Sequence, residues 1–103
     1  MIDANRFVRE FGPQMVHVHA KDLMIDRDGL YEHGIMSAGM GWQVPRMPGL
    51  GEVDWPDFFA TLYRAGYDGP IIIEHEDRTF EGTDEKIKRG FALARDTLRP
   101  YVK

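Results

Sequence analysis

Two groups of ionisable residues in this sequence have the types and spacing that metal binding requires. The first is a His-x-His pair, His17 and His19, and the second contains Glu74 and Glu76. If each group lies on a β-strand, alternation places both histidines on one side of the first strand and both glutamates on one side of the second. An imidazole beside a carboxylate suits a divalent ion such as Mn²⁺, Co²⁺, Zn²⁺ or Mg²⁺.

Each group also has a plainer interpretation. A His-x-His pair in a strand is often structural, and the charged run from Glu74 to Asp77 is also typical of a solvated strand end. Two ligands are moreover too few for a closed site, because zinc takes three or four ligands and octahedral ions take six. The presence of both groups at the ends of two strands nevertheless favours a shared site.

The segments around these groups alternate between helical and strand patterns. We expect helices over residues 3–11, 54–65 and 84–98, and strands over residues 14–20 and 71–74. Asp3, Asp54 and Thr83 are suitable N-caps for the three helices. The strand over residues 71–74 is apolar on both faces, as in a parallel sheet covered by helices. The order of elements is a βαβα pattern, which indicates a parallel α/β fold with function at the carboxyl ends of the strands.

The region between the first strand and the second helix has no clear periodicity. Residues 21–52 are rich in glycine and proline, with methionines and a tryptophan between them. We therefore expect a long irregular loop here. A loop of more than about 15 residues is uncommon and is usually functional or disordered.

Length and composition exclude several classes of protein. A chain of 103 residues can form one domain, which we place over residues 1–103, but not a large enclosed barrel. The 13 Lys and Arg against 17 Asp and Glu give a formal net charge of −4, which disfavours nucleic acid as a partner. We expect no membrane span and no secretory leader. The absence of cysteine excludes thiolate metal sites and favours a reducing, cytoplasmic compartment.

Three motifs carry a resemblance to a known family. They are residues 16–22 (VHVHAKD), 46–55 (RMPGLGEVDW) and 66–77 (GYDGPIIIEHED), in this order and with matching spacing. Together they resemble the end of a sugar phosphate isomerase/epimerase of the xylose-isomerase-like TIM-barrel superfamily. This superfamily includes ketose 3-epimerases, hydroxypyruvate isomerase and inosose dehydratase. The resemblance implies a partial TIM barrel: the last two βα units of a (β/α)8 barrel, with parallel strands and flanking helices.

The resemblance also implies roles for four residues. His19 matches a metal ligand of the family, and Glu74 matches a second ligand that is also a general acid/base in the epimerases. Arg46 precedes the Pro-Gly-x-Gly turn at the position of a substrate-binding arginine. Lys21 matches a lysine of the inosose-dehydratase-like members, which implies a substrate contact.

The implied activity is proton transfer next to the carbonyl of a small sugar or keto-inositol, with a divalent metal ion as cofactor. The metal polarises the substrate oxygens, one carboxylate removes the proton and a second returns it. In the family, two more metal ligands and the second acid/base residue lie on earlier strands, which this chain lacks. The implied partners are therefore a missing N-terminal barrel portion or further copies of the chain.

Three other functions remain open. A non-catalytic α/β module derived from this fold would use its open strand edges for association. A small cupin-like metal-binding protein would share the His-x-His pair but would need strands where helices are predicted. The related apurinic endonuclease branch uses more histidine ligands and a basic groove, which the net charge disfavours.

Overall fold

The computed structural model describes residues 2–103 and contains, within them, four α-helices, four strands and two 3-10 turns. The helices are α1 (Ala4–Phe11), α2 (Arg27–His33), α3 (Trp55–Arg64) and α4 (Asp84–Leu98). The strands are β1 (Val18–Ala20), β2 (Asp22–Ile25), β3 (Gln43–Arg46) and β4 (Ile71–Ile73), and the turns are η1 (Gly12–Gln14) and η2 (Arg78–Phe80). None of the helices in this part of the chain is both long and apolar enough to cross a membrane.

The N-caps of the three predicted helices are confirmed. The side chains of Asp3, Asp54 and Thr83 each accept a hydrogen bond from the backbone amide three residues further on. Such a bond satisfies one of the amides that the first helical turn leaves without a partner. The helix after Asp54 ends where expected, because Gly66 takes a φ of +86°, which favours glycine.

The central element is a parallel pair of strands, β1 and β4, and the chain between them contains β2, α2, β3 and α3. Val18 pairs with Ile71, His19 with Ile72 and Ala20 with Ile73. The parallel α/β class is thus confirmed. Both strands are shorter than predicted: η1 ends at Gln14 and β1 begins only at Val18, and β4 ends at Ile73.

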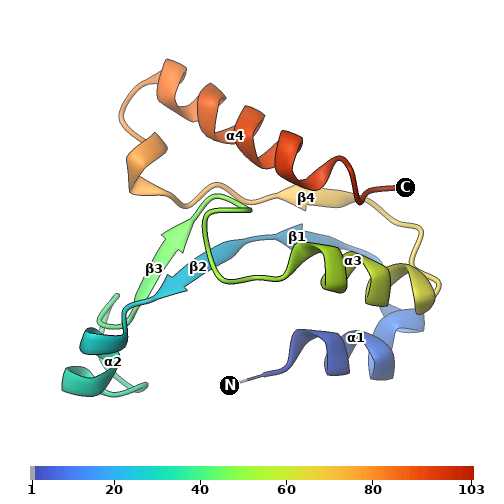
Figure 1. Ribbon diagram of the computed structural model, residues 1–103, viewed down its shortest axis with the longest axis horizontal. Helices are drawn as coiled ribbons and strands as arrows, with labels where there is room; N and C mark the ends of the chain where they lie inside the picture. The colour runs from blue at the N-terminus through green and yellow to red at the C-terminus, as the bar shows by residue number, and fades with distance from the viewer. Residues whose placement is uncertain (1) are drawn as a thin grey trace.

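The prediction of one long irregular loop over residues 21–52 is wrong for most of its length, because residues 22–46 form an arm with secondary structure of its own. In this arm β2 and β3 pair antiparallel, from Asp22 opposite Arg46 to Ile25 opposite Gln43, and α2 lies between them at one end of the molecule (Figure 1). The strands have only four residues each, and β3 contains Pro45, which cannot donate to a ladder. Such strands leave no readable alternation in the sequence.

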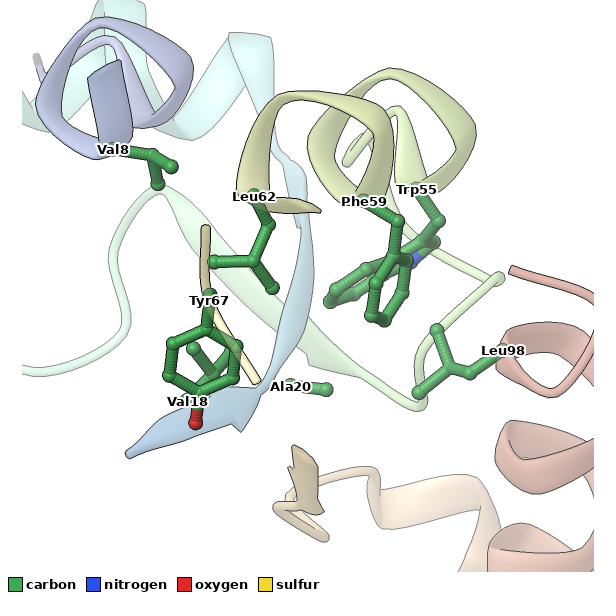
Figure 2. Close-up of a cluster of buried hydrophobic side chains, with 8 residues drawn as sticks. All are labelled: Val8, Val18, Ala20, Trp55, Phe59, Leu62, Tyr67 and Leu98. Atoms are coloured by element: carbon green, nitrogen blue, oxygen red, sulfur yellow. The ribbon is translucent and has the colours of Figure 1, made fainter. Parts of the chain in front are cut away.

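The hydrophobic core lies on one side of the β1–β4 sheet, beneath α3. Figure 2 shows side chains from α1, β1, α3 and α4 converging on this region. Phe59 and Leu62 of α3 pack with Val18 and Ala20 of β1, and all four are at most 6% exposed. Burial of such side chains is the main driving force for the docking of α3 on the sheet.

Within residues 2–103, no helix covers the opposite face of the sheet. Ile72 is 38% exposed and its neighbour His19 is also exposed, so the expectation that both faces of the 71–74 strand are covered is wrong for this chain. The described residues form two open two-stranded sheets, β1–β4 and β2–β3, and not a closed barrel. The candidate site lies on this open face, at the carboxyl ends of the strands.

Candidate functional site

The pairing of β1 with β4 brings His19 and Glu74 together. Glu74 follows the last residue of β4, and its amide donates to the carbonyl of Ala20 at 3.0 Å, which continues the ladder by one residue. Its side chain therefore emerges on the same face as His19. His19 Nδ1 and Glu74 Oε2 are 3.6 Å apart, and both side chains are accessible.

Lys21 joins this pair to Glu76. Its Nζ lies 2.7 Å from Glu76 Oε2 and 3.5 Å from Glu74 Oε1. Both glutamates thus contact Lys21, although β4 ends at Ile73 and neither glutamate lies on the strand that was expected to place them. The hydrogen bond to Glu76, with the charges of both glutamates, outweighs partial burial and raises the pKa of Lys21 above its ordinary value. Lys21 is thus a permanent cation near neutral pH and not a general base.

Arg46 is held at the end of β3 by a buried carboxylate. Its Nε donates to Asp77 Oδ2 at 3.0 Å, and the amides of Met47 and Thr79 donate to the same carboxylate at 3.0 and 2.9 Å. Burial alone would raise the pKa of Asp77, but these amide bonds and the guanidinium of Arg46 hold it below its ordinary value. Asp77 is consequently ionised at neutral pH and fixes Arg46 in one orientation.

A cleft of about 420 Å³ opens beside this ion pair, and we call it the Arg46 cleft. It is lined by β3 and Met40 on one side and by the 76–81 segment on the other, with Glu76, Asp77 and Arg46 among its walls. Lys21, Glu76 and Glu74 connect the cleft to His19 through the ion pairs described above. The four predicted site residues thus lie along one continuous polar strip.

A second buried carboxylate, Asp22, organises the turn that follows Arg46. It lies at the start of β2 and accepts hydrogen bonds from the amides of Gly49 and Val53 and from the indole of Trp55, at 3.0–3.1 Å. The backbone at Gly51 approaches this carboxylate so closely that a side chain there would collide with it. The sequence alone assigns Asp22 no role, because its hydrogen-bond partners lie about 30 residues further along the chain and no local pattern points to them.

The residues present provide only part of a metal site. Two ligands at about 2.1 Å from an ion in tetrahedral geometry are about 3.4 Å apart, close to the separation of His19 Nδ1 and Glu74 Oε2. Within residues 2–103, however, no group of three or more His, Cys, Asp or Glu side chains is placed to hold an ion. The donors fit two positions of a metal site, and any further ligands must come from outside this part of the chain.

Comparison with known proteins identifies the architecture to which these strands belong. A family model described as a xylose isomerase-like TIM barrel matches residues 1–97. The chain belongs to this family. The family match covers all three motifs on which the predicted resemblance rested, and that resemblance is confirmed. Comparison with curated proteins and with solved structures gave no match.

In a TIM barrel, eight parallel strands surround an interior, and functional side chains lie at the carboxyl ends of the strands. Among the described residues, β1 and β4 are parallel, and the helices α3 and α4 follow them in the chain. His19, Lys21 and Glu74 lie at the carboxyl ends, as in active sites of this fold. His17 lies on the exposed part of the chain before β1 and contacts none of them by hydrogen bond or ion pair among the described residues.

Proposed function

We propose that this chain supplies the last two βα units of a divalent-metal-dependent isomerase or epimerase acting on a small sugar or keto-inositol. The observation that carries the proposal is the His19–Glu74 pair, 3.6 Å apart at the ends of adjacent parallel strands and accessible on the face of the sheet without helices. An imidazole and a carboxylate in this arrangement match two metal ligands of the family that the sequence resembles.

Each residue of the polar strip has a distinct role in this proposal. Glu74 carries a proton to or from the carbon next to the substrate carbonyl, because its carboxylate is accessible and close to His19. Lys21 stays charged and stabilises negative charge on a substrate oxygen. Arg46 binds and orients the substrate from the far end of the strip. A bound divalent ion would polarise the substrate carbonyl and lower the barrier to proton removal.

The same proposal requires further protein around the described strands. Proton transfer between two faces or two carbon atoms needs a second acid/base group, and the family carries it on earlier strands. Each edge of the β1–β4 sheet borders a groove: one of about 380 Å³ between α1 and β1, and one of about 370 Å³ between β4 and α4. Phe7, Val18, Ile73 and Leu98 are among the apolar residues in these grooves. We propose that additional βα units, from the N-terminal portion of the barrel or from other copies, pack there.

Metal binding by the chain tests this proposal directly. We expect Mn²⁺, titrated into the purified chain and followed by electron paramagnetic resonance, to bind weakly, since only two protein ligands are available. His19→Ala and Glu74→Gln should each weaken binding at least tenfold. His33→Ala is the matched control, because His33 forms an imidazole–carboxylate pair with Glu32 at 3.8 Å but lies on α2, away from the strand ends.

The result that contradicts the proposal is binding that persists in the His19 and Glu74 variants or that depends equally on His33. The non-catalytic alternative, an association module, is favoured by the same open edges of the sheet. It predicts association of the chain with no dependence on Mn²⁺, His19 or Glu74, which light scattering of the same variants would show.

A further inference from the structure

The Arg46 cleft contains charged groups that compensate one another. Arg46 is only 24% exposed in its side chain and Asp77 is 2% exposed, with 3.0 Å between Arg46 Nε and Asp77 Oδ2. At this distance and burial the carboxylate offsets most of the charge of the guanidinium. The bond uses Nε, and in residues 2–103 neither terminal amino group of Arg46 donates a hydrogen bond to the protein. These groups remain as donors for a ligand.

The other cations around the cleft are also matched by carboxylates. Lys21, at its inner end, is engaged by Glu76 at 2.7 Å and by Glu74 at 3.5 Å. Arg78 and Glu81 are both exposed on the lining of the cleft and are equal and opposite in charge. Carboxylates therefore outnumber cations along the whole strip.

This charge balance disfavours a phosphate group. A phosphate dianion needs a surplus of cations or several free backbone amides, as at the start of a helix. Here the amides of Met47 and Thr79, which could have served, already donate to Asp77. Alternating donors and acceptors suit hydroxyl groups instead, because a hydroxyl both donates and accepts.

We infer that the Asp77–Arg46 pair makes this cleft selective for an unphosphorylated, polyhydroxylated carbonyl compound over its phosphate ester. Asp77 holds the guanidinium in place and cancels its charge, so Arg46 binds as a fixed donor and not as an anion receptor. This inference rests on the proposed function, which gives the substrate class. It adds that the substrate carries no phosphate group.

The experiment compares two probes that differ only by a phosphate group, fructose and fructose 6-phosphate. Each is titrated into the ¹⁵N-labelled full chain at neutral pH, with the Arg46 Nε–H and the Thr79 amide as reporters. We expect both signals to shift with fructose, and fructose 6-phosphate to bind more weakly than fructose. In Asp77→Asn, which keeps the size of the side chain and removes its charge, the affinity for fructose 6-phosphate should rise about tenfold. The affinity for fructose should not rise.

Asp96→Asn is the matched control, because Asp96 forms an exposed pair with Arg95 at 2.7 Å outside the cleft, and it should change neither affinity. The Trp55 indole signal, which depends on Asp22 and not on Asp77, reports whether the variant is folded. The inference is overturned if the wild-type chain binds fructose 6-phosphate as tightly as fructose or more tightly, if Asp77→Asn fails to raise the affinity for fructose 6-phosphate, or if neither probe shifts the two reporters. The Mn²⁺ titration tests the proposed function and the sugar titration tests this inference. A failure of one can therefore be told apart from a failure of the other.

Discussion

Truncation of Asp22 is the most direct test of how the structure positions its site. The carboxylate is 1% exposed and accepts long-range hydrogen bonds from the amides of Gly49 and Val53 and from the indole of Trp55. In Asp22→Ala these three donors lose a charged acceptor inside the protein. Each unsatisfied buried donor costs about 1–3 kcal/mol, and water entering the small cavity recovers part of that. We expect the free energy of unfolding to fall by about 3–5 kcal/mol, a large fraction of the 5–15 kcal/mol typical of a domain.

Urea unfolding followed by tryptophan fluorescence and circular dichroism measures this loss. Asp26→Ala is the matched control: Asp26 lies in the same arm but caps α2 through one amide, that of Gly29, at 3.0 Å. Its loss should cost about 1 kcal/mol. Trp55→Phe removes one of the three donors, leaves the carboxylate in place and should give an intermediate value. If Asp22→Ala costs no more than Asp26→Ala, Asp22 does not hold the 49–55 turn and the reasoning is refuted.

Two further predictions concern the segment after β4. Gly90→Ala should lower the free energy of unfolding by about 1–3 kcal/mol in the same urea assay, because its methyl group would lie 2.9 Å from Phe80 Cβ and 3.0 Å from His75 Nε2; an unchanged midpoint would show that α4 shifts freely. The pKa of Asp77 is lower in the folded than in the unfolded state, where it is about 3.9. Its ionisation therefore stabilises the fold above about pH 4, and this contribution is lost as the pH falls through the folded-state pKa. In Asp77→Asn, the free energy of unfolding should fall less steeply as the pH is lowered below about 4. The same pH dependence in the variant and the wild-type chain would contradict the lowered pKa of Asp77.

The sequence predicts α1, α3, α4 and the two parallel strands because their signals are local. Asp54, Gly66 and the apolar spacing of 58–63 define α3 without reference to any other segment. The arm was missed for the opposite reason. The strands β2 and β3 are stabilised by each other across 17 intervening residues, 26–42, and neither has a recognisable pattern alone.

The same distinction applies to the site. His19 and Glu74 could be predicted as neighbours, because strand alternation and parallel pairing are general rules. Asp22 and Asp77 belong to charged runs that look like solvated strand ends. Both are instead buried and bind backbone amides far along the chain, and only the folded structure brings those amides to them.

The register of β1 against β4 limits which parts of this chain can change in length. Because Ala20 pairs with Ile73 and Glu74 continues the ladder, an insertion or deletion of one residue between the paired positions of either strand would place His19 and Glu74 on opposite faces of the sheet. The segment between β2 and β3 is not subject to this restriction, since α2 lies at the far end of the arm (Figure 1). Related sequences should accordingly keep the spacing within residues 18–21 and 71–77 fixed, and should differ in length mainly between residues 26 and 42.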